Sequence, residues 1–539
     1  MGKKYKQLQP DDPLLHSDHP RPVSRRDFIR QGLIAGGSVM TTGGIFSLFA
    51  NPRMAYAELS TDIKDLATAS GCPVGGSVSP KLPIICFDLA GGANIAGSNV
   101  LVGTNGQLDG MSEAAYSRLG LPNTMLPTGT NGPNFIDEQL GLAFHTNSAM
   151  LEGILEKAPG VVGKVNGIVI PARSDNDTAN NPHNPMYGLA HAGAVGDVTN
   201  LIGSRNSDSG GNSISPVALM NPEMRPVKVD RPSDVAGMVD TGDLTAILND
   251  PQDVKAVMES IARLSNKKVG KVQTLVDRDA VIKDLMRCGY LGAADLADRF
   301  AGKSIDPDLD PDIVTQPSPN KPDSPPQPDG VIPIFDRDTE FSQDGEFRKT
   351  ASVMKMVVDG HAGAGTITMG GYDYHTGNRS VGELRDKRAG RCIGACLEYA
   401  RRRNSPLIIY VFSDGSVSSN GNIDNSQNGG GKGEWTSDNS STAASFMLVF
   451  HPTSSPVLTP PYATTRQLGT FSNAGSVVTN SSPAANNVNL LVNTVILNYM
   501  ALNNDTALFT DVYQNTLGIS HGLGNYQDYI AFNPLPPVT

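Results

Sequence analysis

The amino-acid sequence predicts an α/β fold built on a doubly wound, mainly parallel central sheet with long polar loops. Short, nearly continuous apolar runs alternate along the chain with longer segments whose apolar residues recur at helical spacing. Such runs are typical of strands covered on both faces, and their alternation with helices is typical of parallel sheets. Stretches rich in glycine, serine and asparagine indicate long loops between these elements.

The predicted strands end mostly at glycine, proline or a polar residue. They cover residues 82–89, 165–170, 366–369, 407–412 and 445–450. The predicted helices cover residues 253–264, 272–300, 347–358, 381–403 and 487–502. Because the strands come from both halves of the chain, we expect one sheet to draw on both.

The amino terminus has the order of an export signal. Arg25 and Arg26 precede Asp27-Phe28, a glycine-rich apolar region follows at 32–50, and then comes the small-x-small sequence Ala55-Tyr56-Ala57. An arginine pair ahead of an apolar region is typical of the twin-arginine route, which exports folded proteins. We expect the twin-arginine translocase to recognise Arg25 and Arg26, and cleavage to occur at the site formed by Ala55 and Ala57. A short anchor that stays attached is the alternative.

This signal divides the chain into a signal peptide at 1–57 and a mature α/β domain at 58–539, periplasmic or secreted. The formal net charge of the chain is −11, and its leader is basic. An acidic mature surface argues against nucleic acid or a membrane surface as partner. No later apolar run approaches the roughly 20 residues that span a bilayer. The segment 91–97 lacks the spacing of a nucleotide-binding loop, so no nucleotide or organic cofactor is predicted.

In an oxidising compartment, the five cysteines could be paired in disulfides or remain free thiols. Cys72 and Cys86 flank the start of the mature domain and could pair. Cys392 and Cys396 lie four residues apart on a predicted helix, where a bridge would be strained. Buried free thiols are the alternative to both pairings.

Two segments have a biased composition. Residues 306–329 are rich in aspartate and proline, which favours an extended, solvated surface insertion that could bind calcium weakly. Residues 416–445 are rich in glycine, serine and asparagine, and they leave the carboxyl end of a predicted strand. Ligands bind at that edge of open α/β sheets, so this segment is either a lid or a disordered loop.

Acidic residues close several predicted strands. Asp373 and His375 lie in the sequence Gly370-Gly371-Tyr372-Asp373-Tyr374-His375, while Asp88 and Asp414 end two other strands. Carboxylates converging with an imidazole could hold a divalent metal such as zinc, manganese or calcium, as in metal-assisted hydrolases. The alternative is that these residues cap helices or hydrogen-bond to turns. A buried Asp88 would need a metal, a helix amino terminus or an arginine to offset its burial.

Other histidines could complete such a site. His451 follows an apolar strand and is expected at the same sheet edge as Asp414. The remaining histidines considered, each more often structural than a ligand, are His145, His183, His191, His361 and His521.

The run Leu89-Ala90-Gly91-Gly92, the later Gly370–His375 motif and the strand ending in Ser413-Asp414 resemble the exported family called domain of unknown function 1501. That family is similar in fold to the alkaline phosphatase and sulfatase superfamily. The resemblance implies that Asp373 and His375 are metal ligands and that Asp414 is the acidic residue closing the next strand. It also places the family's late Asp-His-Gly sequence near Asp438-Asn439-Ser440, without its histidine.

The resemblance implies a nucleophilic serine or threonine after Asp88, for which Ser98 and Thr104 are the candidates. The histidine that follows the acidic residue in phosphatases is replaced by Gly415. We therefore expect one of two functions. The first is a metal-dependent hydrolase of phosphate or sulfate esters. The second is a non-catalytic envelope or secretion-associated binding protein that uses the same fold and binds an envelope partner through residues 416–445.

Overall fold

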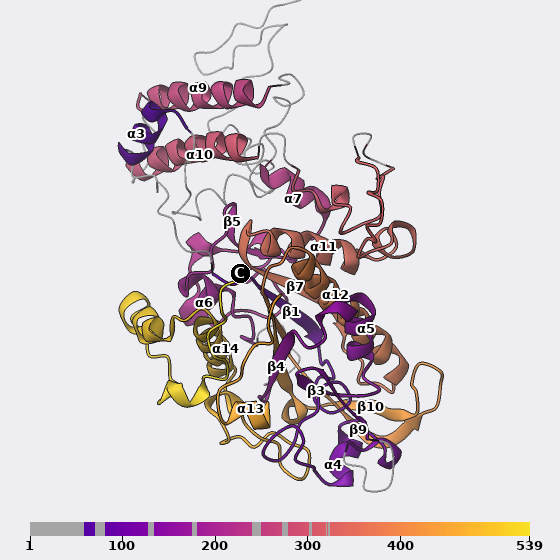
Figure 1. Ribbon diagram of the computed structural model, residues 1–539. Helices are drawn as coiled ribbons and strands as arrows, with labels where there is room; N and C mark the ends of the chain where they lie inside the picture. Colours follow the sequence, from indigo (N-terminus) through magenta and orange to yellow (C-terminus); the bar gives the residue numbers. More distant parts are fainter. Residues whose placement is uncertain are drawn as a thin grey trace, which may run out of the picture.

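A computed structural model of the chain describes residues 59–69, 81–127, 134–174, 181–239, 250–271, 279–300, 304–319, 321 and 324–538. The predicted signal residues Arg25, Arg26, Ala55 and Ala57 lie outside this part of the chain. The described chain folds around a seven-stranded sheet with the order β4-β11-β8-β1-β7-β5-β6. Helices surround this sheet in the main body (Figure 1). The predicted α/β class with a mainly parallel sheet is confirmed.

The strands predicted from the sequence all form, with somewhat different ends. They are β1 Ile84–Gly91, β4 Val165–Pro171, β7 Ala362–Tyr372, β8 Leu407–Ser413 and β11 Ala444–Phe450. β1 pairs in parallel with β7 and β8, whereas β11 runs antiparallel to β8 and β4. The sequence analysis missed two short strands at one end of the sheet, β5 Thr199–Gly203 and β6 Val227–Lys228.

Helices cover both faces of the sheet (Figure 1). Because side chains alternate along a strand, Ile85 and Phe87 of β1 pack on one face and Ile84 and Cys86 on the other. The first face lies against α5 Ala149–Lys157, α11 Gly345–Val358 and α12 Arg379–Arg402. The second lies against α6 Met186–His191 and α14 Val488–Leu502.

Shorter elements complete the main body. They are α4 Glu113–Arg118, α7 Pro232–Val239, α13 Tyr462–Thr465, α15 Phe509–Asp511 and the hairpin of β2 Ile136–Leu140 with β3 Leu142–His145. None of the helices in the described ranges is both long and apolar enough to cross a membrane.

A separate helical group stands at one end of the molecule (Figure 1). It consists of α3 Thr61–Ala69, α9 Pro251–Val269 and α10 Asp279–Arg299. Ile63, Ala262 and Leu291, one from each helix, are buried together in a small apolar cluster. At the end of α10, Arg299 donates a hydrogen bond to the carbonyl of Asp197 at 2.9 Å, which ties the group to the main body.

Of the alternatives left open for the cysteines, buried free thiols are confirmed for three of them, and the two possible pairings are not formed. Cys86, Cys392 and Cys396 are free and fully buried, so Cys86 does not pair with Cys72 and no bridge joins Cys392 to Cys396. Burial raises the pKa of all three thiols. Cys288, on α10, is disulfide-bonded, and Cys72 lies outside the described residues.

The aspartate- and proline-rich segment is packed against the main body, which corrects the expectation of a solvated insertion. Ile313 and Val314 are fully buried in the main core. Asp310 is 7% exposed, and its carboxylate lies 2.7 Å from both Lys355 and Arg403. Lys355 of α11 and Arg403, which follows α12, neutralise this carboxylate, so the composition alone was a poor guide to exposure.

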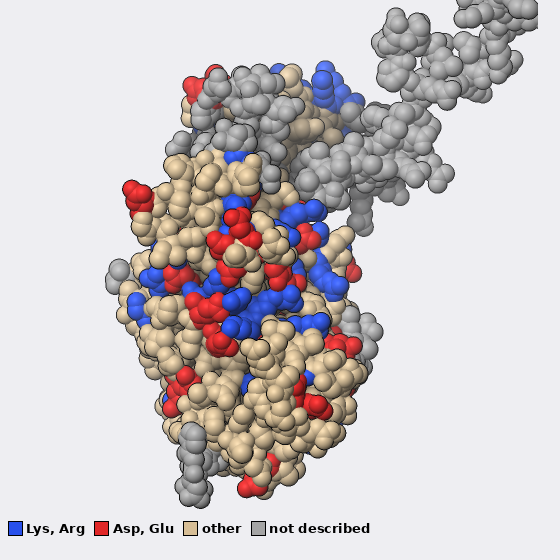
Figure 2. All heavy atoms as spheres, turned by 90° about the vertical axis from the view of Figure 1, so that its right-hand side faces the viewer, with Lys and Arg blue, Asp and Glu red and all other residues tan. Residues whose placement is uncertain are grey.

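Charged side chains of both signs are interleaved on the face that carries α5, α11 and α12 (Figure 2). Lys387 and Arg391 of α12 form ion pairs with Glu152 and Glu156 of α5. The basic residues of α12 are therefore mostly neutralised by acidic neighbours.

The segment expected to be a lid or a disordered loop is a β-hairpin. β9 Val417–Asp424 pairs with β10 Lys432–Asp438 in antiparallel fashion. Gly430 and Gly431 both have positive φ in the connecting turn, which favours glycine. Trp435 is only 1% exposed, so the hairpin is packed against the body of the protein.

Candidate metal site at the carboxyl edge of the sheet

The carboxyl ends of β1, β7 and β8 meet at one edge of the sheet, and Gly91 and Gly92, at the end of β1, contact the other two strand ends. The N–H of Gly91 donates to the Oδ1 of Asp414 at 2.8 Å, and that of Gly92 donates to the carbonyl of Tyr372 at 3.1 Å. Gly91 has a φ of +124°, and a methyl group on it would lie 2.4 Å from the amide nitrogen of Asp373. Glycine is required here because any side chain would separate the strand ends.

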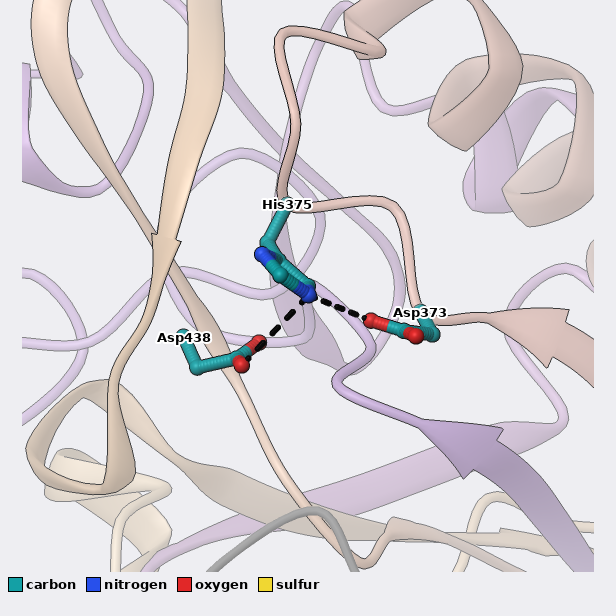
Figure 3. Close-up of side chains that lie close together, drawn as sticks. All are labelled: Asp373, His375 and Asp438. Atoms are coloured by element: carbon teal, nitrogen blue, oxygen red, sulfur yellow. Dashed lines mark ion pairs between the residues drawn. The ribbon is translucent and has the colours of Figure 1, made fainter.

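Three side chains from two elements converge just beyond this edge (Figure 3). The Nε2 atom of His375 lies 2.7 Å from an oxygen of Asp373 and 3.5 Å from an oxygen of Asp438. One potential ligand atom from each residue lies within 4.8 Å of the others. Within the described ranges, no other group of three acidic, histidine or cysteine side chains is this close. All three side chains are accessible, with exposed fractions between 30% and 60%.

Side chains at the end of β7 and just after it alternate between buried and accessible, which explains why Asp373 and His375 lie on the same side of the chain. Tyr372 and Tyr374 are fully buried, whereas Asp373 is exposed and His375 is half-buried. The hydroxyl of Tyr374 accepts the N–H of Asn94 at 2.7 Å and donates to Asp386 at 3.2 Å. These buried hydrogen bonds hold the segment so that its two potential ligands point away from the core.

The hairpin brings Asp438 to this pair. Its strands are held on the start of α12, which follows His375 after a short turn. The N–H of Gly377 donates to the carbonyl of Trp435 at 2.7 Å, and Asp424 accepts the N–H of Ser380 at 3.2 Å. The third carboxylate therefore depends on a contact between segments that are distant in sequence.

Asp373, His375 and Asp438 offer donor atoms that suit a divalent cation, and the distances between these atoms nearly match those around a bound metal. Two carboxylate oxygens and one imidazole nitrogen suit zinc or manganese better than calcium, which prefers oxygen ligands alone. Tetrahedral ligands at roughly 2.0 Å from zinc lie about 3.3 Å from one another. The separation of 3.5 Å between His375 and Asp438 already matches this value. The separation of 2.7 Å between His375 and Asp373 would need to open slightly.

Asp88, a predicted ligand, is fully buried and fully engaged by a neighbouring loop. Its carboxylate accepts the N–H groups of Asn212 and Ser213 at 2.6 and 3.0 Å and the hydroxyls of Ser213 and Thr368 at 3.2 Å. Burial raises the pKa of Asp88, and these hydrogen bonds oppose that rise. The loop thus supplies hydrogen bonds that offset the burial of this carboxylate.

Asp414, also a predicted ligand, is fully buried beside the same loop. Besides the N–H of Gly91, its carboxylate accepts the side-chain amide of Asn212 at 3.2 Å. Asn212 therefore bridges Asp88 and Asp414. Neither residue belongs to the group formed by Asp373, His375 and Asp438.

The two candidate nucleophiles lie in the chain that follows β1. Ser98 is 1% exposed, and its hydroxyl accepts the side-chain amide of Asn94. Thr104 lies in a turn, where its N–H donates to the carbonyl of Asp109 at 3.1 Å. In the described part of the chain, neither hydroxyl hydrogen-bonds to Asp373, His375 or Asp438.

The other histidines have structural surroundings. His451 lies at the opposite edge of the sheet from Asp414, because β11 is antiparallel to β8, so its predicted position was wrong. His183 is buried and stacks on Phe412, and burial lowers the pKa of His183 to about 3. His191 and His145 each lie within 3.0 Å of a backbone carbonyl, and His361 lies 2.9 Å from Asp197. His521 packs against Phe509 and Tyr513.

Asp438 is the potential ligand that the sequence analysis did not select. The family resemblance implies a late acidic residue near this position, although the histidine that follows it in the family is Asn439 here. The chain matches no protein-family model, and neither the curated proteins nor the solved structures contain a match to it.

Proposed function

We propose that the protein is an exported metal-dependent hydrolase of phosphate or sulfate esters, and that Asp373, His375 and Asp438 hold its divalent cation. The proposal rests chiefly on the convergence of these three side chains at the carboxyl edge of the sheet. That edge is where open α/β folds bind ligands. The resemblance to the alkaline phosphatase and sulfatase superfamily supports the ester class of substrate.

A divalent cation at this position would polarise the ester group and activate a water molecule for attack. The protein itself would contribute orientation, because the buried and hydrogen-bonded Tyr374 keeps Asp373 and His375 on the same side of the chain. The exposed fractions of the three side chains leave room for a substrate to approach. Ser98 and Thr104 remain the proposed alternatives to water as nucleophile.

Metal binding is the first test. Protein purified without chelator should contain zinc or manganese in stoichiometric amount, and calorimetric titration of stripped protein should restore it. His375→Ala and Asp438→Asn should each weaken binding by about tenfold or more, as loss of a ligand requires. The matched control is His361→Ala, because His361 forms a similar pair with Asp197 away from the site. Equal binding by all four proteins would refute the assignment.

Turnover is the second test. Generic phosphate and sulfate monoesters should be hydrolysed by the metal-loaded mature protein and not by His375→Ala. The metal titration of the wild type distinguishes failure of metal binding from failure of catalysis. If the wild type bound metal but hydrolysed no ester, the metal site would stand and the hydrolase would be refuted.

A non-catalytic binding protein is the second candidate function. It is favoured by the hydrogen bonds that engage Asp88 and Asp414 and by Asn439, which stands where the resembled family has a histidine. The turn of the hairpin is exposed and polar, and it would contact the envelope partner. Replacing Asn425, Gln427 and Asn428 with alanine should then abolish capture of that partner. Turnover that survives the triple replacement, with no partner captured by either protein, would decide for the enzyme.

The proposed location has its own test. Replacing Arg25 and Arg26 with lysine should leave a longer precursor in the cytoplasm, because the translocase reads the arginine pair. The wild-type protein should begin at or near Glu58 in the periplasm or outside the cell. Normal export of the double variant would refute the twin-arginine route.

A further inference from the structure

We infer that Arg385 binds the anionic group of the substrate beside the proposed metal site. Its side chain is half-buried on α12, and its guanidinium lies against Gly371, two residues before Asp373. A methyl group on Gly371 would lie 2.7 Å from the Cζ of Arg385 and within 2.9 Å of both terminal nitrogens. The guanidinium therefore lies directly over the glycine, and a side chain at this position would displace it.

Arg385 differs from the other basic residues of its helix in having no partner. Arg379 pairs with Glu383, Lys387 with Glu152, Arg388 with Asp344, Arg391 with Glu156, and Arg401 and Arg402 with Glu398. Among the arginines that the structure describes, only Arg385 makes neither an ion pair nor a hydrogen bond through its guanidinium. An arginine fork with free donors is the group that best recognises phosphate or sulfate through paired hydrogen bonds.

Two contacts place Arg385 beside the end of β7. The hydroxyl of Tyr372 donates to the backbone carbonyl of Arg385 at 2.9 Å, while the guanidinium lies over Gly371. Two extended residues span about 7 Å, so Arg385 lies within the reach of one small ester from Asp373. Gly370 and Gly371 are both exposed, which leaves the outer side of the guanidinium open to a ligand.

Charge balance gives an independent reason for a cation here. A divalent metal held by two carboxylates and a neutral imidazole carries no net charge. Such a centre attracts a doubly charged ester weakly unless a further positive group lies beside it. Lys432 and Arg379 cannot supply it, because both are buried and paired with Glu383. Arg385, whose guanidinium has no acidic partner among the described residues, can supply this positive charge.

This inference rests on the proposed function, and the experiment separates the two. Inorganic phosphate should be titrated calorimetrically into metal-loaded and metal-free mature protein, in the wild type and three variants. Arg385→Met should weaken phosphate binding by about tenfold or more, since it removes a charge-assisted pair of hydrogen bonds. Arg385→Lys should fall between the two, because it keeps the charge and loses the fork. Metal affinity should be unchanged in both.

Arg391→Met is the matched control, because it removes the same charge from α12 about 9 Å further along the helix axis. It should bind phosphate as the wild type does. If Arg391→Met lost as much phosphate affinity as Arg385→Met, the loss would come from long-range charge alone, and the inference would be overturned. Phosphate affinity unchanged in Arg385→Met would also overturn it. If the wild type binds no metal, the proposed function fails, whereas phosphate binding by the metal-free protein still tests Arg385. If turnover occurs, Arg385→Met should raise KM more than it lowers kcat.

Discussion

The guanidinium of Arg379 lies 4.4 Å from the ring centre of Trp435, with both side chains almost completely buried. Arg379 begins α12, and Trp435 lies in the hairpin that ends at Asp438. Arg379 also pairs with Glu383 at 2.6 Å, and Glu383 pairs with Lys432 of the hairpin at 2.6 Å. A buried cation–π contact and the ion pair between Glu383 and Lys432 thus hold the hairpin on the helix.

Replacing Arg379 with methionine should loosen this attachment. We expect a loss of about 3 kcal/mol in the free energy of unfolding, because Glu383 keeps one of its two buried partners. We also expect zinc affinity to fall by about tenfold, since the position of Asp438 depends on the hairpin. Urea unfolding and calorimetric titration measure the two effects.

Glu434→Gln is the control within the same strand, since Glu434 is half-buried and changes little when neutralised. It should alter stability by less than about 0.5 kcal/mol and leave metal affinity intact. If Arg379→Met lost stability but bound zinc as tightly as the wild type, Asp438 would not depend on this contact.

A second buried carboxyl, Asp386, makes stability depend on pH. Burial, with the nearby charge of Glu383, raises the pKa of Asp386 to about 7. In the unfolded chain its pKa is near the ordinary value of 3.8. The unfolded state therefore releases this proton first, and the native state loses stability as the pH rises from about 4 to 7.

Asp386→Asn should remove that loss. Relative to the wild type, the variant should gain stability between about pH 4 and 7, up to roughly 4 kcal/mol at pH 8. At pH 4 the two proteins should differ little. Urea midpoints at pH 4, 6 and 8 provide the measurement. A difference that does not change with pH would mean that Asp386 is ionised in the folded protein.

The sequence was sufficient for five of the seven strands of the central sheet, and only the short β5 and β6 were missed. Long apolar runs such as 407–412 form buried strands in any α/β context, and each predicted run became a strand. It was not sufficient for segments ordered by tertiary contacts. The hairpin has a polar, glycine-rich sequence, and the burial of Trp435 against Arg379 is what orders it. For the same reason, the aspartates near Asp310 could not be recognised as buried before their basic partners were known.

The candidate site likewise contains residues that the local sequence could predict and residues that only tertiary contacts bring into place. The alternation of Asp373, Tyr374 and His375 is local, so the spacing alone indicated two ligands on one side of the chain. Asp438 could not be selected by spacing, because the docked hairpin determines its position. Asp88 and Asp414 do lie at the predicted edge, but Asn212 bridges them, and nothing in the local sequence around 212 indicated that contact.

The buried ion pair between Asp310 and Lys355 of α11 provides a further prediction. Replacing Asp310 with asparagine leaves Lys355 buried with only Asp359, at 3.2 Å, as an acidic partner. We expect a loss of about 3–5 kcal/mol in the free energy of unfolding, as for other broken buried pairs. The more exposed Asp312 pairs with Arg402 at 3.4 Å, and Asp312→Asn should cost about 1 kcal/mol or less. Similar losses in the two variants, measured by urea unfolding, would contradict a buried role for Asp310.

Gly91 and Gly360 allow backbone strain to be separated from crowding at the site. Both have positive φ, +124° at Gly91 and +83° at Gly360. A methyl group on Gly360 would meet no atom within 4 Å, whereas one on Gly91 would lie 2.4 Å from the amide nitrogen of Asp373. Gly360→Ala should therefore cost only the strain of the left-handed backbone, about 1–2 kcal/mol.

Gly91→Ala should add to that strain the displacement of the end of β7, with a total loss of about 3–5 kcal/mol. Because the displaced segment carries Asp373, zinc affinity should also fall by about tenfold or more. Gly360→Ala should bind zinc as the wild type does, since it lies at the opposite end of β7. Calorimetric titration at a temperature where all three proteins are folded compares them directly. If Gly91→Ala bound zinc normally, the close approach of β1 to Asp373 would not be needed to shape the site.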